Sequence, residues 1–388
     1  MFAGPGTGAG PSWVTAWTVA PSVHVLGSGG DSGLTFNQQT EREILHPSVG
    51  GTSTRIHLSN QYGAAPLTIG GVHTAQNGSG SSITAGTDQI VTFAGSQSIT
   101  IPAGGTVVSD SINFAVPALQ NVAVSIFFPS NGAITRTTSH QFTEQTNYFA
   151  SGNVSGSATL SNAGQIGNYY FLTGIDVQNP ALSASVVTLG ASITAGFAST
   201  NNANHRWPDL LAQRLNNAGI VLGVANMGIA GNKLLSDNGE DGVSAQNRFS
   251  RDVLSQPGVK YVIFSDDPIN DLGGNPSLPL SQFTQAYQSL INQAHAQGIK
   301  FYCSTLTPYQ GSGAWTAQGE ATREQINAFI RSTTSPCDGV IDQDAATHDP
   351  SNPTMYLPAF DSGDHLHPND AGYQAIANAV NLSLLTAN

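Results

Sequence analysis

The chain has 388 residues, of which 39% are hydrophobic and only 9% are charged, and its formal net charge is −12. Its 12 basic residues are scattered, which excludes a nucleic-acid partner because phosphate binding requires clustered lysine and arginine. It has no run of about 18 apolar residues, so no membrane span is expected. The length favours two domains, and the low charge favours a secreted, extracellular protein, although the first residues do not have the pattern of a signal peptide.

The first half of the chain has the pattern of strands and turns. Residues 53–59 and 122–128 alternate in the manner of half-buried strands, and glycine pairs such as Gly50-Gly51 and Gly104-Gly105 mark turns between such segments. We therefore predict a β-rich accessory domain of the sandwich or jelly-roll type over residues 1–180. The sequence does not indicate what this domain binds.

From residue 181 the pattern changes to alternating strands and helices, after a boundary marked by Asn179-Pro180. Strands are expected at 186–189, 220–225, 261–264, 300–306 and 339–342. Between the third and fourth strands the apolar residues Phe283, Ala286, Tyr287, Leu290, Ile291 and Ala294 share one helix face, with Ser281 as the expected cap and Gly298 at the end. Such alternation predicts a parallel sheet covered by helices on both faces, over residues 181–388.

Two cysteines lie in this second half. Cys303 falls within the expected fourth strand and Cys337 just before the fifth. They form either one disulfide or two buried thiols. The offset expected between neighbouring parallel strands favours the buried thiols, because free cysteine is commonly buried.

Polar residues follow the expected strands at one edge of the sheet. Ser192 follows the first strand, the segment 226–228 the second and Asn270 the third, while Asp364 and His367 follow the fifth after a loop. Parallel sheets bind ligands at the carboxyl ends of their strands. A serine becomes a useful nucleophile when a histidine accepts its proton and a carboxylate orients that histidine. The sequence therefore predicts a serine hydrolase.

These four blocks resemble the SGNH (GDSL-type) hydrolase superfamily, and the first half resembles the β-rich domain of one secreted branch of it. The resemblance covers about residues 185–388 and implies a flavodoxin-like three-layer α/β/α fold with a central parallel sheet. It also implies Ser192 as nucleophile, His367 as general base and Asp364 as the orienting carboxylate. The backbone N–H groups of Ser192 and Gly228 and the side-chain amide of Asn270 would then form the oxyanion hole.

Two residues depart from the pattern of that superfamily. Ala191 stands where the superfamily has an aspartate that holds the active-site loops by hydrogen bonds, and Pro268 stands where it has glycine. Proline fixes φ and removes an N–H, so the loop that presents Asn270 is expected to differ. An engineered change, a degenerate enzyme and an altered specificity would each account for these residues.

Four further residues are candidates for the site. Asp267 and Asp271 offer an alternative acid and base for glycoside hydrolysis, although solvated loop carboxylates are the favoured interpretation. His205 either contacts substrate or packs at the start of a helix. Trp315 belongs either to a lid or aromatic platform, or to an exposed loop. The histidines have no metal-ligand spacing, so we expect no metal and no cofactor.

The leading interpretation is a serine esterase that hydrolyses an acyl or acetyl ester of a small molecule or a carbohydrate through an acyl-enzyme. One alternative is a glycosidase or other carbohydrate-active enzyme that uses loop carboxylates. Another is a non-catalytic glycan-binding protein. The acyl group, the alcohol and the oligomeric state remain open.

Overall fold

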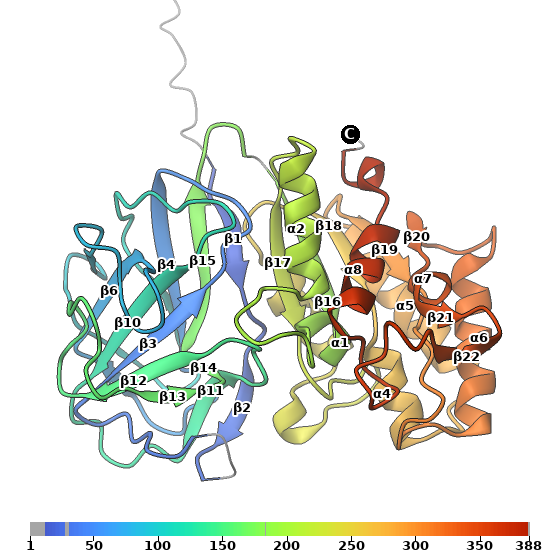
Figure 1. Cartoon of the computed structure of the whole chain (residues 1–388), viewed down its shortest axis with the longest axis horizontal. Coiled ribbons are helices and arrows are strands. Elements are labelled where there is room, and N and C mark those ends of the chain that lie inside the picture. Colours follow the sequence, from blue (N-terminus) through green and yellow to red (C-terminus); the bar gives the residue numbers. More distant parts are fainter. Residues whose placement is uncertain (1–11, 28–30, 183, 387–388) are drawn as a thin grey trace, which may run out of the picture.

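Antiparallel strands form the N-terminal half of the molecule, and a parallel sheet covered by helices forms the other half (Figure 1). The structure is a computed structural model, and it describes residues 12–27, 31–182 and 184–386. Strand β15 (Leu172–Gln178) ends the first half, and β16 (Ser185–Gly190) begins the second. The two strands lie on either side of the boundary predicted between residues 180 and 181.

The N-terminal domain consists of antiparallel sheets around one apolar core. The four-stranded sheet has the order β1 (Val14–Thr18), β15, β4 (Ser53–Ser59), β9 (Thr106–Val108). The six-stranded sheet has the order β13 (Gly164–Ile166), β12 (Asn147–Ser151), β3 (Gln39–Leu45), β10 (Val122–Phe128), β6 (Gly71–Gln76), β7 (Gln89–Val91). Smaller sheets contain β14 (Tyr169–Tyr170), β11 (Arg136–His140) and β2 (Ser22–Val25), and β5 (Leu67–Ile69) with β8 (Ile99–Ile101). The predicted β-rich domain is therefore present.

Strand β3 carries two acids that are buried inside this domain. Glu41 is 1% exposed, and neither of its carboxyl oxygens has a hydrogen-bond partner among the described residues. Burial raises the pKa of Glu41, and the neighbouring Glu43 raises it further. A raised folded-state pKa gives stability that is complete at low pH and is lost as the pH rises through that pKa.

We therefore expect the melting temperature to fall as the pH rises above the ordinary titration range of a glutamate, and Glu41→Gln to reduce that fall, because an amide does not ionise. Thermal unfolding of both proteins across this range measures the effect. Glu324→Gln, which changes a 51% exposed carboxylate on a helix surface, is the control. An identical pH dependence of the wild type and Glu41→Gln would contradict the prediction.

The second half contains five parallel strands in the order β17 (Gly223–Gly228), β16, β18 (Val259–Phe264), β19 (Lys300–Ser304), β20 (Gly339–Ile341). The second strand along the chain thus lies outside the first, which is the flavodoxin-like order. From β16 the chain continues to β17 on one side of that strand and then crosses to β18 on the other side. A topological switch point therefore falls between β16 and β18. The predicted fold class is confirmed.

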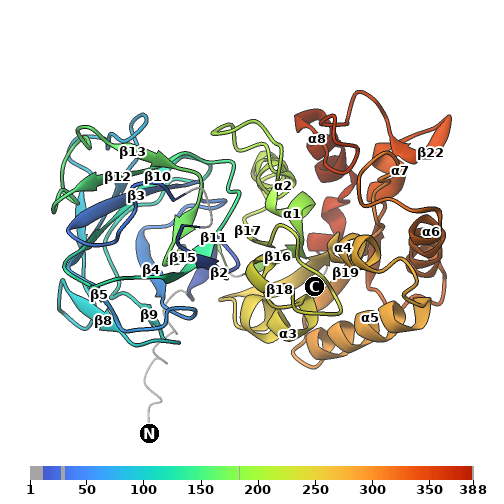
Figure 2. The same cartoon turned by 90° about the horizontal axis from the view of Figure 1, so that it is seen from below.

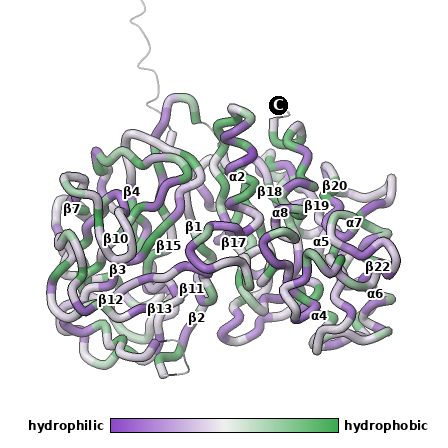
Figure 3. Tube along the Cα trace, in the orientation of Figure 1, coloured by the Kyte–Doolittle hydropathy of each residue, from purple (hydrophilic) through white to green (hydrophobic). Residues whose placement is uncertain are grey.

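Helices cover both faces of this sheet, with α2 and α8 on one side and α3 and α5 on the other (Figure 2). The helices are α1 (Ser192–Ala195), α2 (Trp207–Asn217), α3 (Ala245–Phe249), α4 (Asp267–Gly274), α5 (Leu280–His295), α6 (Ala317–Arg331), α7 (Gln343–Thr347) and α8 (Asp370–Ala379). The remaining elements are η1 (Gly239–Asp241), the π-helical η2 (Ser250–Leu254), β21 (His348–Asp349), β22 (Asn352–Tyr356) and η3 (Leu382–Leu385). Hydrophilic and hydrophobic residues alternate around the turns of α2, and its apolar side chains are buried (Figure 3). No helix in the described parts of the chain is long and apolar enough to cross a membrane.

Helix α5 confirms the predicted apolar face, because all six of its expected core residues are buried. Its start differs from the prediction. The cap is Pro279, and Ser281 lies in the first turn. Proline suits this position because its fixed φ leads directly into a helix and no intrahelical N–H is lost.

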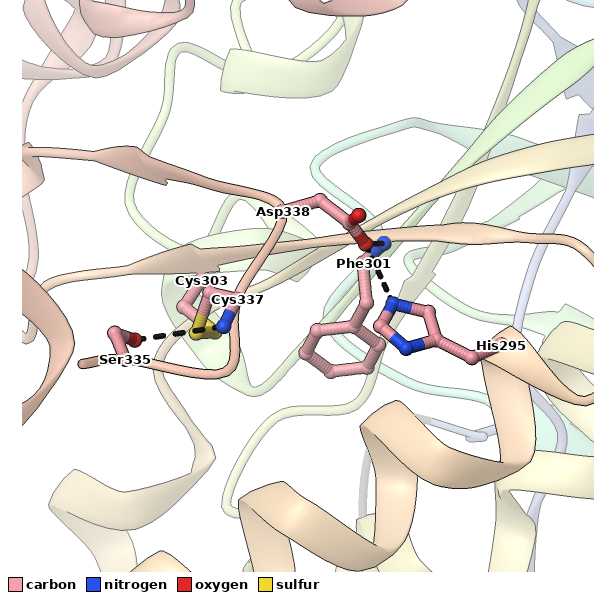
Figure 4. Close-up of a disulfide and its surroundings, with 6 residues drawn as sticks. All are labelled: His295, Phe301, Cys303, Ser335, Cys337 and Asp338. Carbon is pink, nitrogen blue, oxygen red and sulfur yellow. Dashed lines mark hydrogen bonds and ion pairs between the residues drawn. A yellow bond between two sulfur atoms is a disulfide. The ribbon is translucent and has the colours of Figure 1, made fainter. Parts of the chain in front are cut away.

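The two cysteines form a disulfide, so the prediction of two buried thiols is wrong (Figure 4). Strand register alone pairs Cys303 with Val340. The segment before β20, however, is held beside β19, because the Asp338 carboxylate accepts the Phe301 N–H and the Asp338 N–H donates to the Phe301 carbonyl. This brings the Cα atoms of Cys303 and Cys337 to 5.9 Å from each other.

The two domains pack along β1 and β17 (Figure 1). The N–H of Val224 in β17 donates to the hydroxyl of Ser48, and the N–H of Thr15 in β1 donates to the carbonyl of Pro257. These hydrogen bonds fix the β-rich domain against the edge strand of the parallel sheet. A separate contact lies near the carboxyl end of β16, where the Glu144 carboxylate of the β-rich domain accepts the N–H of Ala198 in the loop after α1.

Candidate functional site

The structure brings Ser192, His367 and Asp364 together in one chain of hydrogen bonds. Ser192 begins α1 directly after β16, and His367 follows the loop after β22. The Ser192 Oγ lies 2.9 Å from Nε2 of His367, and Nδ1 of that ring lies 2.7 Å from an Asp364 carboxylate oxygen. Ser192 is 8% exposed and His367 is 9% exposed. Residues 175 positions apart in the sequence thus meet at the switch point of the sheet.

Asp364 is held ionised by the loop around it. Burial raises the pKa of its carboxyl, but hydrogen bonds from the His367 ring and from the N–H groups of His367 and Leu366 outweigh burial and lower that pKa to about 2. A carboxylate bonded to Nδ1 fixes the orientation of the imidazole and leaves Nε2 facing the serine.

A carboxylate from another strand holds the turn that carries Ser192. Asp266 follows β18 and is 3% exposed. Its two oxygens accept the N–H groups of Ala191 (3.1 Å) and Ile193 (2.8 Å) and the hydroxyl of Thr194 (2.6 Å). Gly190 makes room for this contact, since a Cβ there would lie 2.4 Å from an Asp266 oxygen.

The sequence reasoning noted Asp266 only as part of an acidic cluster with Asp267 and Asp271 and did not predict this role. Two features of the sequence could have indicated it. Ala191 stands where the superfamily has an aspartate before the serine, and Asp266 follows a strand that ends at the same edge of the sheet. In this chain the acceptor for the turn around the serine comes from the third strand of the sheet instead.

The prediction that the Gly228 N–H is free for a substrate oxygen is wrong. That N–H donates to the Asn226 side chain at 3.0 Å. The physical reason is a shift of the second strand, which was expected to end at residue 225 and instead ends at Gly228. Gly228 is required for packing, because a Cβ there would lie 2.2 Å from the backbone nitrogen of Ala195.

The loop that leaves this strand passes between the serine turn and α4. The N–H of Ile229 donates to the carbonyl of Gly190, and the side-chain amide of Asn270 donates to the carbonyl of Asn232 at 2.8 Å. Gly231 lies between these two contacts with a φ of 75°, a conformation that favours glycine. Within the described residues, no acceptor bonds the N–H of Ser192 or of Gly231. Two backbone donors and one amide therefore lie on the same loops.

Pro268 does not disrupt the presentation of Asn270. It occupies the first turn of α4, where a proline costs no intrahelical hydrogen bond. Asn270 is consequently held on a helix, with its amide directed toward the loop after β17. The sequence predicted that Pro268 would alter the loop that presents Asn270. In the structure, Pro268 instead lies in the first turn of helix α4.

A buried arginine that the sequence did not single out lies beneath these loops. Arg248, 1% exposed, donates to the carbonyls of Gly190 and Met227 and to the Asn232 side chain. It also pairs with the carboxylate of Asp252. One guanidinium thereby ties the ends of β16 and β17 to the loop that contains Gly231.

Neither Asp267 nor Asp271 is a solvated loop carboxylate, and neither is placed to act as an acid or base on a substrate. Asp267 is 0% exposed and faces Arg248, and burial raises its pKa to about 8. Asp271 is 3% exposed and accepts the N–H groups of Leu234 and Leu235, while burial raises its pKa to about 6. Their burial argues against the glycosidase alternative.

The other two candidate residues do not join the hydrogen-bond chain of Ser192, His367 and Asp364. His205 pairs with Asp370 at 2.7 Å, which ties the segment before α2 to the start of α8. Trp315 is partly buried against the core of the α/β domain, so it is not the exposed loop residue that one interpretation expected. Across the described residues, no group of three or more histidine, cysteine or acidic side chains is arranged to hold a metal ion.

Residues 188–375 match the GDSL-like Lipase/Acylhydrolase family. The C-terminal domain therefore belongs to the SGNH (GDSL-type) hydrolase superfamily, and its class is that of ester hydrolases. No curated protein matches the chain.

Solved structures similar to the chain include a carbohydrate acetylesterase family member from Sinorhizobium meliloti, at 14% identity and a TM-score of 0.41 over 53% of this chain and 100% of that one. A GDSL-like lipase from Bacteroides thetaiotaomicron matches at 16% identity and a TM-score of 0.40, over 53% of this chain and 90% of that one. A family two carbohydrate esterase from Cellvibrio japonicus matches at 13% identity and a TM-score of 0.37, over 97% of this chain and 95% of that one.

Proposed function

We propose that the protein is a serine esterase that removes an acyl or acetyl group from a carbohydrate ester, with Ser192, His367 and Asp364 as its catalytic triad. The observation that carries this proposal is the continuous hydrogen-bond chain from Ser192 Oγ through the His367 ring to Asp364. Each contact has the length that proton transfer and ring orientation require.

In the acylation step, Ser192 Oγ attacks the ester carbonyl while Nε2 of His367 accepts its proton. The tetrahedral intermediate then collapses, the alcohol leaves with the proton from His367, and the acyl group stays on Ser192. Water attacks the acyl-enzyme with His367 again as base, and the released acid restores the free serine. Asp364 stays ionised throughout and stabilises the imidazolium.

The developing oxyanion requires preorganised donors, and we assign the N–H groups of Ser192 and Gly231 and the side-chain amide of Asn270. Asp266 holds the turn of Ser192, Arg248 holds the loop of Gly231 through Asn232, and Asn270 lies on α4 and bonds the Asn232 carbonyl, so the donors need little reorganisation during the reaction. Gly231 takes the role expected of Gly228, whose N–H is already bonded.

Export from the cell is part of this proposal. The bond between Cys303 and Cys337 persists in an oxidising compartment, whereas cytosolic thiols are usually reduced. The low charge of the chain is typical of extracellular β-rich proteins as well.

Two measurements test the proposed function. We expect release of p-nitrophenol from p-nitrophenyl acetate and release of acetate from an acetylated oligosaccharide. We also expect a fluorophosphonate to modify Ser192 and no other serine, as read by peptide mass spectrometry. Ester turnover that continues after complete labelling would remove Ser192 from the mechanism.

The pH dependence of kcat/KM tests the role of Asp364. The pKa of its carboxyl is lowered to about 2, so Asp364 stays ionised well below neutral pH. We therefore expect the loss of kcat/KM on the acid side to have slope one, because only the general base then gains a proton. A loss with slope two above about pH 4 would contradict the assignment of Asp364 as a permanently ionised carboxylate.

A further inference from the structure

The N-terminal domain reaches the proposed active site through the segment 142–146, which follows β11. The ring of Phe142 lies 5.7 Å from the ring of Phe197, and the ring of Phe197 lies 4.5 Å from the imidazole of His367. Phe142 is therefore no farther from His367 than these two separations together. It also lines a small hollow with Ile229 and Ala230, which begin the loop that carries Gly231.

Hydrogen bonds lock this segment to the loop after α1. The Glu144 carboxylate accepts the N–H of Ala198 at 3.1 Å, and the Glu144 carbonyl accepts the N–H of Asn202 at 3.0 Å. The Asn202 side chain accepts the N–H of Thr146 and the amide of Gln145, both at 2.7 Å. The position of Phe142 relative to Ser192 and His367 is thus fixed by contacts on both sides.

The backbone of both segments is strained. Phe142 and Glu144 have φ of 55° and 48°, and Ala198 and Asn202 have φ of 68° and 64°. Such conformations are uncommon for residues other than glycine and are held only where the surroundings impose them, as at ligand-binding sites. Even so, the segment leaves the Phe142 side chain 50% exposed, which is the highest value among the exposed large hydrophobic residues.

A shallow depression of about 460 Å³ opens beside Phe142. Its lining combines the aromatic ring with polar side chains without positive charge, of which Gln165 and Asn201 are exposed, Glu144 and Thr146 are half-buried, and Thr143, Gln145 and Asn168 are buried and hydrogen-bonded within the protein. Neutral amides and hydroxyls can both donate and accept hydrogen bonds, as sugar hydroxyl groups do, and an aromatic face packs against the C–H groups of a sugar ring. The absence of lysine and arginine among these lining residues disfavours an anionic ligand.

We propose that Phe142 and the amides of this depression form a binding subsite for a neutral sugar ring of the ester substrate, so that the β-rich domain supplies one wall of the active site. This inference rests on the proposed esterase function. It assigns to the β-rich domain the recognition of the sugar that forms the alcohol part of the ester. The sugar ring stacks on Phe142, and Gln165 and Asn201 hydrogen-bond its hydroxyls.

Two substrates test the subsite. We expect Phe142→Ala to lose about tenfold more kcat/KM on an O-acetylated xylo-oligosaccharide than on p-nitrophenyl acetate, through a higher KM. Phe142→Trp keeps an aromatic face and is expected to retain the preference. The control is Ile90→Ala, which removes a 47% exposed side chain on β7, the edge strand opposite to the β13 strand that carries Gln165. It should leave the ratio of kcat/KM on the two substrates unchanged. Equal losses on both substrates in Phe142→Ala would overturn the proposal.

Direct binding separates failure of the subsite from failure of the esterase function. Calorimetry with xylohexaose, cellohexaose and mannohexaose on the Ser192→Ala protein requires no turnover. We expect at least one of them to bind, and Phe142→Ala or Gln165→Ala in that background to weaken its affinity about tenfold. Absence of binding by all three hexasaccharides, or affinities unchanged in both variants, would overturn the subsite even if esters are hydrolysed.

Discussion

Ser192→Ala is expected to lower kcat on any ester substrate by roughly 10⁴- to 10⁶-fold while KM changes little. The methyl group that replaces the hydroxyl has no lone pair to attack the carbonyl. The donors of the proposed oxyanion hole remain, so a small residual rate above that of water is expected. Steady-state kinetics with p-nitrophenyl acetate measures this effect, at enzyme concentrations high enough to quantify the residual rate.

The matched control is Ser199→Ala, which removes a buried hydroxyl seven positions away on the loop after α1. That hydroxyl has no hydrogen-bond partner among the described residues. We expect its removal to leave kcat within about threefold of the wild type. A Ser192→Ala protein that retains a tenth of the wild-type kcat would contradict the nucleophile assignment.

Asp266→Ala is expected to lower kcat about 10²-fold and to destabilise the protein by about 2–5 kcal/mol. The carboxylate accepts three hydrogen bonds from the turn that surrounds Ser192, and its removal leaves two buried N–H groups without an acceptor. The serine Oγ then loses its fixed position relative to His367. Because substrate-binding surfaces are not altered, KM is expected to change less than kcat.

Two further variants make this prediction specific. Asp267→Asn changes the adjacent carboxyl, which faces Arg248 and, among the described residues, accepts no hydrogen bond from the turn around Ser192, so the loss of kcat is expected to stay below about tenfold. Adding Ala191→Asp to Asp266→Ala returns a carboxylate to the position that the superfamily uses, and partial recovery of kcat is expected. Full activity of Asp266→Ala at temperatures below its melting point would show that the turn needs no carboxylate.

The order of elements in the second half could be predicted from the sequence because each element carries its own local pattern. The apolar face of α5 repeats at helical spacing, and Ser192, Asn270 and His367 each follow the expected end of an element. Parallel sheets bring such ends to one edge, so local patterns were sufficient to place these residues together. The same local patterns predicted a parallel sheet covered by helices on both faces, and the resemblance to the SGNH superfamily supplied the flavodoxin-like strand order.

Other features depended on packing between segments that are distant in the sequence. Strand β17 ends three residues later than expected, at Gly228, which packs against α1 and whose N–H bonds the Asn226 side chain, so we propose Gly231 as the donor in its place. The Cys303–Cys337 bond depends on how Asp338 holds the segment before β20. The contact of Phe142 with Phe197, on which the proposed sugar subsite is built, depends on the docking of one domain against the other.

The sequence by itself determined which residue types stand at the ends of which strands, because hydrophobic periodicity is a local property of the chain. Only the tertiary structure decided that Asp266, which follows the third strand of the sheet, accepts the hydrogen bonds of the turn around Ser192. In the superfamily an aspartate at the position of Ala191 holds these loops. The physical reason is that a hydrogen bond depends on the final separation of two groups, and for segments 75 residues apart that separation is set by the packing of the whole sheet.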